Sequence, residues 1–244
     1  MSDILHNKAL RNIAKSINQR TKKRNSKRIK RGGNLLQLLE FAKQTTNKQI
    51  EPLSNLTTKD RQMAKLATES YNDYPNEIVN GYELILNSKK IKVWEKDKTL
   101  YLVYQGSKTE KDWENNVRLT FDDLESTDEF KIFNTVYQNL KTTFPNKKII
   151  FVGHSLGGAM ILHMKLLYPS ITGFVFNPGV NLKLIRNGSK LNGINIYSLE
   201  KDIVSDPLGR FLPTSRFFKN TMTSTGDFIQ DGKNAHNIDK WKVY

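Results

Sequence analysis

The sequence has no cysteine, no long apolar run and comparatively few acidic residues. The absence of cysteine among the 244 residues excludes both a disulfide framework and a thiolate metal site. No apolar run approaches the roughly 20 residues that span a bilayer, and the N-terminus lacks the unbroken apolar block of a secretory signal. We therefore expect no transmembrane segment and no export by the secretory route.

The shortage of acidic residues is concentrated at the N-terminus. The chain carries 39 Lys and Arg against 24 Asp and Glu, a net charge of +15. Residues 1–33 hold eleven of these bases and one acid, Asp3, so they account for +10 of that charge. Apolar residues at helical spacing between 4 and 17, followed by a dense basic run over 20–31, predict a basic arm that is amphipathic and helical or disordered.

The sequence leaves the partner of this arm open. A basic amphipathic segment suits peripheral contact with an anionic membrane or with nucleic acid, mitochondrial or nuclear targeting, or no dedicated partner. The Gly32-Gly33 pair also resembles sites cut by virus maturation proteases, although Lys30 stands where an aliphatic residue is usual. We therefore expect an intracellular or virion-associated protein, with peripheral membrane attachment and both kinds of targeting still open.

Beyond the arm, alternating helix and strand patterns predict a second domain over residues 34–244, whose compact body starts near residue 50. Apolar periodicity indicates helices over 34–48, 58–71, 111–119, 128–143 and 159–167. Short β-prone runs indicate strands over 82–86, 91–95, 99–104, 149–152, 171–176 and 194–199. This alternation predicts an α/β fold with a mostly parallel central sheet and helices on both faces.

The most informative stretch is the turn between the strand over 149–152 and the helix that follows it. Residues 153–157 read Gly-His-Ser-Leu-Gly, a G-x-S-x-G pattern, and Gly158-Ala159 extend it. A tight turn of this kind pushes the Ser155 hydroxyl out above the sheet, at the positive end of the next helix. The strand–turn–helix context therefore predicts a nucleophile elbow.

The Gly-His-Ser-Leu-Gly-Gly-Ala string resembles the elbow of the class 3 (fungal-type) lipase family of the α/β-hydrolase fold. The resemblance covers roughly residues 60–244. It implies an α/β-hydrolase fold, a serine esterase acting on lipid esters through an acyl-enzyme, and no metal or organic cofactor.

In α/β-hydrolases the acid and the base follow the serine in the order Asp, His. Two histidines lie downstream of Ser155. His163 falls on the helix behind the elbow, pointing away from the hydroxyl, so elimination leaves His236 as the base. Asp202 lies just past the end of the strand over 194–199 and is the expected acid, with Asp206 as the runner-up.

An oxyanion hole needs backbone or side-chain donors near the reacting carbonyl. One is the N–H of Leu156, directly after the nucleophile. The segment Tyr-Gln-Gly-Ser over 104–107, with Asp-Trp at 112–113, resembles the oxyanion motif of class 3 lipases and implies Ser107 as the second donor. Gln105 replaces the usual Arg of that motif, a residue that supports the loop. By the same resemblance, residues 108–127 are the expected lid.

These features predict a lipase or esterase that hydrolyses triacylglycerol or phospholipid. Two alternatives stay open. One is a catalytically silent hydrolase fold that works as a membrane or nucleic-acid adaptor through residues 1–33. The other is a thioesterase or peptidase that uses the same triad.

Overall fold

The computed structural model describes residues 48–107, 124–200, 202, 205, 209–219 and 236–241. Apart from Lys48, these residues belong to one compact unit that begins at Gln49. Several predictions fall outside the described residues: the basic arm over 1–33, nearly all of the helix over 34–48, the helix over 111–119 and most of the expected lid.

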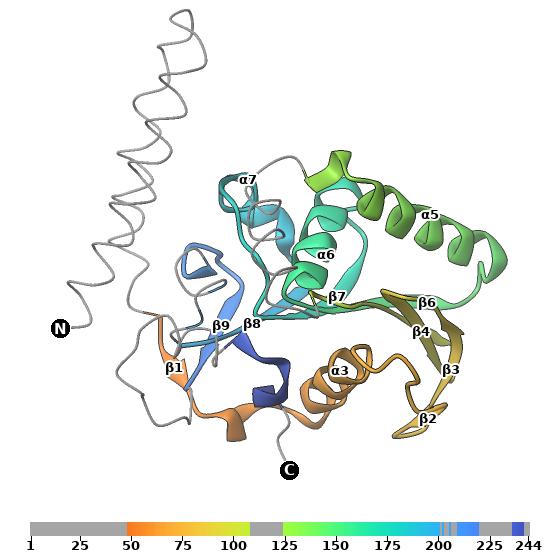
Figure 1. Ribbon diagram of the computed structural model, residues 1–244. Coiled ribbons are helices and arrows are strands. Elements are labelled where there is room, and N and C mark those ends of the chain that lie inside the picture. Colours follow the sequence, from red (N-terminus) through yellow and green to blue (C-terminus); the bar gives the residue numbers. More distant parts are fainter. Residues whose placement is uncertain are drawn as a thin grey trace, which may run out of the picture. The chain divides into compact units, whose positions relative to one another are not determined.

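Nine strands in the described part of the chain form a single sheet, in the order β1-β9-β8-β7-β6-β5-β4-β3-β2 (Figure 1). The strands are β1 (Ile50–Glu51), β2 (Ile78–Val79), β3 (Tyr82–Asn87), β4 (Ile91–Lys96), β5 (Thr99–Tyr104), β6 (Lys148–His154), β7 (Thr172–Phe176), β8 (Ile194–Leu199) and β9 (Ser215–Phe218). From β5 through β9 to β1 every pair is parallel, and from β2 to β5 every pair is antiparallel. The predicted mostly parallel sheet is confirmed.

Helices cover both faces of this sheet, as predicted. The α-helices of the described residues are α3 (Thr58–Glu69), α5 (Asp128–Thr143), α6 (Leu156–Leu167) and α7 (Leu182–Arg186); the short 3₁₀ helices are η1 (Leu53–Asn55), η2 (Leu124–Ser126), η3 (Gly188–Leu191) and η4 (Ile238–Trp241). Figure 1 shows α3 on one face and α5, α6 and α7 on the other. Parallel crossovers are right-handed, so stepping in one direction from β5 to β8 places each connecting helix on the same face.

Local sequence explains where helices α3 and α5 begin. The Thr57 side chain accepts a hydrogen bond from the backbone N–H of Asp60, and the Asp60 carboxylate accepts one from the backbone N–H of Thr57. This reciprocal pair is a capping box at the start of α3. Thr127 caps α5 by accepting from the N–H of Phe130. Helix α5 has the predicted bounds, whereas α3 ends two residues earlier than predicted and leaves Tyr71 beyond the helix.

The core lies on both faces of the central strands, because alternate residues of each strand point to opposite sides. On the α5 face, the Phe133 ring packs edge-on against Tyr104 and Phe151, with ring centroids 4.8 and 5.9 Å apart. On the α3 face, Val103 and Val152 join a separate buried cluster with the inward residues of α3. The central strands are therefore covered by side chains on both faces.

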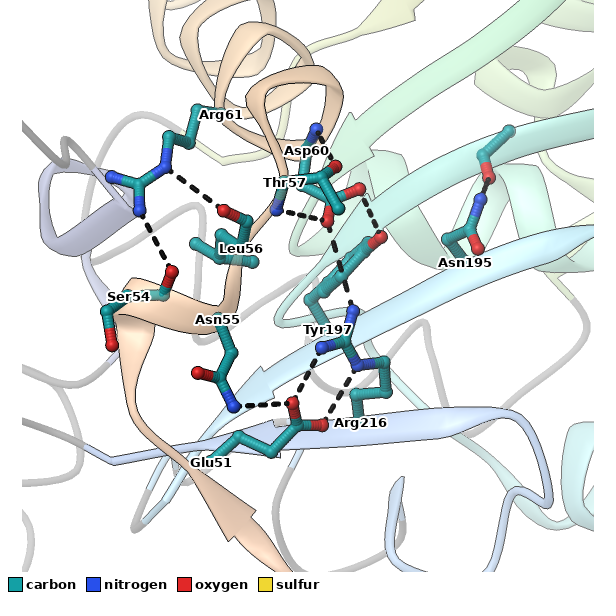
Figure 2. A network of polar contacts seen from close by, with 11 residues as sticks. Glu51, Ser54, Asn55, Leu56, Thr57, Asp60, Arg61, Asn195, Tyr197 and Arg216 are labelled. Atoms are coloured by element: carbon teal, nitrogen blue, oxygen red, sulfur yellow. Dashed lines mark hydrogen bonds and ion pairs between the residues drawn. The ribbon is translucent and has the colours of Figure 1, made fainter.

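A polar network fixes the β1 edge of the sheet to the α3 face (Figure 2). Arg216 on β9 donates to both carboxyl oxygens of Glu51 on β1, at 2.9 and 2.6 Å. The Tyr197 hydroxyl on β8 donates to Asp60 on α3 at 2.7 Å, and Arg216 lies 3.9 Å from the same carboxyl group. The hydrogen bond from Arg216 holds the pKa of Glu51 below its ordinary value. One guanidinium thus connects residues that are far apart in the sequence.

None of the helices in the described ranges is both long enough and apolar enough to cross a membrane.

Candidate active site

The predicted elbow lies between β6 and α6. Ser155 has φ 56° and ψ −122°, a conformation that residues with a side chain rarely adopt. It is held there on both sides, because its N–H donates to the Phe176 carbonyl at 3.1 Å and its own carbonyl accepts from Ala159 at 3.0 Å. Strand, turn and helix therefore hold the Ser155 backbone in a strained conformation.

The glycine that follows the serine lets α6 approach the sheet closely. A Cβ atom on Gly157 would lie 2.0 Å from the carbonyl oxygen of Tyr104 at the end of β5. No side chain fits there without moving backbone, so the second glycine of the G-x-S-x-G pattern is required by packing as well as by the turn.

Ser155, His236 and Asp202 meet at the carboxyl edge of the sheet. His236 Nε2 lies 2.7 Å from Ser155 Oγ, and His236 Nδ1 lies 2.8 Å from Asp202 Oδ2. All three residues are buried, with exposed fractions of 5% for the serine, 7% for the histidine and 1% for the aspartate. Because a carboxylate only accepts, Nδ1 carries the proton of neutral His236, and Nε2 is left to accept from the serine hydroxyl.

The Asp202 carboxyl group is held from its other side as well. Its Oδ1 accepts a hydrogen bond from the Ser205 backbone N–H at 2.6 Å, and its own N–H donates to the Leu199 carbonyl at 3.2 Å. The turn after β8 therefore fixes the orientation of the group that faces His236.

Asn177 connects the strand before this turn to its neighbour, and sequence reasoning did not single it out. It is fully buried and has φ 44°. Its side-chain oxygen accepts from the Leu199 N–H at 2.9 Å, and its own N–H donates to the Tyr197 carbonyl at 2.7 Å. The end of β7 is thereby tied to the end of β8, where Asp202 follows. A polar residue directly after a buried strand was the available signal.

The oxyanion segment predicted from the sequence follows β5 and lies against the elbow. A Cβ atom on Gly106 would lie 3.0 Å from Ser155 Cβ, so the residue directly before Ser107 packs against the serine. The amide nitrogen of the Gln105 side chain faces two backbone carbonyls. It donates to that of Ser70 at 2.9 Å and to that of Lys89 at 3.0 Å. Gln105 thus anchors this loop in the position where the lipase motif has Arg. The Asp-Trp pair at 112–113 lies outside the described residues.

His154, directly before the nucleophile, was missed as a functional candidate. It is 4% exposed, its Nδ1 lies 2.7 Å from the Tyr71 hydroxyl, and its Nε2 lies 2.9 Å from the backbone carbonyl of His236. Burial, together with repulsion from His236, moves the pKa of His154 well below 6.5, so the ring is neutral at physiological pH. Its place in the elbow string was the only sequence signal.

The other sequence candidates lie away from the triad or outside the described chain. His163 is buried on α6, where its Nδ1 lies 3.0 Å from Glu125 and its Nε2 lies 3.1 Å from Asn181. Both nitrogens thus face residues outside the triad, in agreement with its elimination as the base. Asp206 lies outside the described residues. Within the ranges that the structure describes, no group of three or more His, Cys, Asp or Glu side chains is arranged to hold a metal ion.

Comparison with solved structures shows the fold. A mutant form of MDLA from Penicillium cyclopium matches 78% of this chain and 99% of its own, with a TM-score of 0.51 and 15% sequence identity. The chain has the α/β-hydrolase fold of the fungal lipases.

Two further fungal enzymes match less well. A triacylglycerol lipase from Penicillium expansum has a TM-score of 0.45 and 15% identity, over 69% of this chain and 79% of its own. A lipase from Rhizopus microsporus var. chinensis has a TM-score of 0.46 and 19% identity, over 67% and 77%. No family model matches the sequence, and no curated protein matches it.

Proposed function

We propose that this protein is a serine hydrolase of carboxylic esters. The observation that carries the proposal is the hydrogen-bonded series from Ser155 Oγ to His236 Nε2 at 2.7 Å and from His236 Nδ1 to Asp202 at 2.8 Å, on a serine held in a strained elbow. This is the arrangement by which a weak nucleophile is activated by a base that an acid keeps in the right tautomer.

In the first half of the reaction, Ser155 Oγ attacks the ester carbonyl carbon while its proton passes to His236 Nε2. The carbonyl π electrons move to the oxygen, and the resulting oxyanion accepts hydrogen bonds from the Leu156 N–H and from Ser107. Each such donor typically lowers the barrier by about 3 kcal/mol. Collapse of this intermediate expels the alcohol, which takes its proton from His236 and leaves the acyl group on Ser155.

In the second half, water attacks the acyl-enzyme and gives a proton to His236 Nε2. Collapse releases the carboxylic acid as the proton returns to Ser155 Oγ. Asp202 stabilises the imidazolium in both halves without becoming protonated. The sequence of steps consumes one ester and one water, and yields one alcohol and one acid.

We further propose that the substrates are lipid esters, triacylglycerol or phospholipid. The support is the class 3 lipase resemblance of the elbow over 153–159 and of the oxyanion segment over 104–107, carried on the α/β-hydrolase fold of the fungal lipases. Residues 1–33, with a net charge of +10, are proposed to draw the enzyme to anionic membranes.

The proposal is tested with Ser155→Ala in the full chain. The wild type is expected to hydrolyse a short-chain nitrophenyl ester and to react covalently with a fluorophosphonate probe. The variant is expected to show no labelling, and its kcat is expected to fall by at least about 10³-fold. Its circular dichroism spectrum is expected to stay unchanged, which shows that the fold is intact. An active variant, or a wild type that neither hydrolyses nor labels, would contradict the serine mechanism.

Substrate class needs a second measurement, because a thioesterase or peptidase would label in the same way. Release of fatty acid from triacylglycerol emulsion, from neutral vesicles and from anionic vesicles is compared with turnover of a thioester and a peptide. Fatty-acid release that is fastest from anionic vesicles, and slows as salt rises, supports both the lipid substrate and the role of the arm. Turnover of only the thioester or the peptide would reject the lipid substrate.

A further inference from the structure

Tyr71 and His154, two ring side chains outside the triad, connect the oxyanion loop, the elbow and the backbone of His236. Tyr71 lies two residues beyond the end of α3, and its hydroxyl is 2.7 Å from His154 Nδ1. The two rings meet edge-on, with centroids 5.8 Å apart and planes at 67°. Neither residue contacts Ser155 Oγ or the Asp202 carboxyl group in any hydrogen bond of the described chain.

The direction of each hydrogen bond follows from the partners. The backbone carbonyl of His236 can only accept, so His154 Nε2 carries the ring proton and donates it across 2.9 Å. The ring is neutral, which leaves Nδ1 as an acceptor, and the Tyr71 hydroxyl therefore donates to it. His154 cannot act as a second base toward the substrate, because both ring nitrogens are already engaged.

The phenol oxygen of Tyr71 also contacts the oxyanion loop. A Cβ atom on Gly106 would lie 2.2 Å from this oxygen and 2.7 Å from the His154 carbonyl. Burial raises the pKa of Tyr71, and a hydrogen bond from the Gly106 backbone partly opposes that rise. A backbone group lowers the pKa of a phenol by donating to it, so the donor is the Gly106 N–H. The phenol oxygen therefore accepts from this N–H and donates to His154.

These contacts form a single series: the Gly106 N–H, the Tyr71 hydroxyl, the His154 ring and the His236 carbonyl. The loop before Ser107, the residue before Ser155 and the backbone of His236 are each attached to it. These parts are far apart in the sequence: His154 and His236 alone are separated by 82 positions. A shift of one part relative to the others would change the distance between the oxyanion donors and the serine.

We propose that Tyr71 and His154 are positioning residues that hold the oxyanion loop in register with the nucleophile and the base. This inference rests on the proposed ester hydrolysis at Ser155. The two residues neither attack the substrate nor take a proton from it. Such positioning acts mainly on the transition state, since the oxyanion forms only there.

The test is a double-mutant cycle on the full chain. Tyr71→Phe removes the hydroxyl and is expected to lower kcat by about 10- to 100-fold, the loss that a small misplacement of reacting groups produces. KM is expected to stay unchanged, and kcat is normalised to the serine labelled by fluorophosphonate, so that misfolded protein does not count.

Two substitutions of His154 separate the two ends of the series. His154→Gln keeps a donor where Nε2 was and loses the acceptor at Nδ1, whereas His154→Asn keeps an acceptor where Nδ1 was. In the Gln background, Tyr71→Phe is expected to cost at least about fivefold less than in the wild type, because that link is already cut. In the Asn background its cost is expected to remain within about twofold of the wild-type cost.

A matched control is Tyr82 on β3, a buried tyrosine whose hydroxyl also donates to a side chain. Tyr82→Phe loses the hydrogen bond from its hydroxyl to Gln62 Oε1 on α3, 2.8 Å long. Because β4 and β5 separate β3 from the strand that carries the elbow, this variant is expected to leave kcat unchanged. If the wild type hydrolyses esters and Ser155→Ala does not, but Tyr71→Phe keeps its kcat, the positioning role is wrong and the esterase stands. Equal Tyr71→Phe losses in all three His154 backgrounds would also refute it. An inactive wild type would refute both proposals.

Discussion

Replacing Asp202 by Asn tests the orientation of His236, the proposed catalytic base, with little change in side-chain shape. The Asn side-chain oxygen can still accept the hydrogen bond from the Ser205 N–H, which is 2.6 Å long in the wild type. The NH₂ group then replaces Oδ2, which lies 2.8 Å from His236 Nδ1. An amide N–H facing a ring N–H at that distance is repulsive, so His236 is expected to switch to the tautomer that carries its proton on Nε2.

The switched tautomer removes the base. Nε2, 2.7 Å from Ser155 Oγ, would then present a proton to the hydroxyl instead of a lone pair. The same change in a serine protease triad lowers kcat about 10⁴-fold, which corresponds to about 5 kcal/mol of transition-state stabilisation. We expect a loss of that size here, with KM little changed, because the oxyanion donors and the substrate contacts are untouched.

The assay is steady-state hydrolysis of a nitrophenyl ester, with the melting temperature measured alongside it. Asp239→Asn is the matched control, since it makes the same carboxyl-to-amide change on η4, three residues after the base and exposed to solvent; it is expected to change kcat by no more than about twofold. An Asp202→Asn variant that keeps more than about a tenth of the activity would refute the tautomer argument. A large loss in Asp206→Asn instead would transfer the acid role to that residue.

Two further predictions concern the scaffold. Gly157→Ala is expected to destabilise the fold by more than about 3 kcal/mol in urea unfolding, because its Cβ would meet the Tyr104 carbonyl at 2.0 Å; a near-neutral result would show that α6 can move away from β5. Glu51→Gln is expected to cost about 1 kcal/mol at pH 7, through loss of the paired hydrogen bonds with Arg216. Because that pairing lowers the pKa of Glu51 from 4.5, its stabilisation is present above pH 4.5 and lost as the pH falls through the folded value, so wild type and variant should converge in acid unfolding.

Local patterns were enough to predict the elements that build the centre of the sheet. The apolar run within β6 and the β-prone run of β8 could be placed, because buried parallel strands have little polar surface. Both ends of helix α5 could be predicted, because Thr127 caps its start and Pro145 follows its last residues. The strands at the β1 edge could not be predicted in this way, since β1 has only two residues and gains its hydrogen bonds from β9, more than 160 positions away.

In the candidate site, too, some residues could be predicted from local patterns and others could not. The G-x-S-x-G turn identified Ser155, and the order of residues after it indicated Asp202 and His236. The role of Gln105 as an anchor of the oxyanion loop could not be predicted, because one of its acceptors lies at the end of α3 and the other in the turn between β3 and β4. The link between Tyr71 and His154 was equally hidden, since a tyrosine beyond a helix end carries no signal of what its hydroxyl reaches.

The sequence by itself determined which side chains are candidates for the reaction and the tight turn that holds one of them, because these depend on residue type and on neighbours within a few positions. Only the tertiary structure decided that Ser155 and His236, separated by 81 positions, lie 2.7 Å apart, and which nitrogen of each buried histidine carries the proton. Proton positions depend on the partners that folding brings together, and a hydrogen bond depends on distances of a few tenths of an ångström. Chain order indicates the candidate residues, whereas the packing of α6 against the sheet and the pairing of β8 within it specify their geometry.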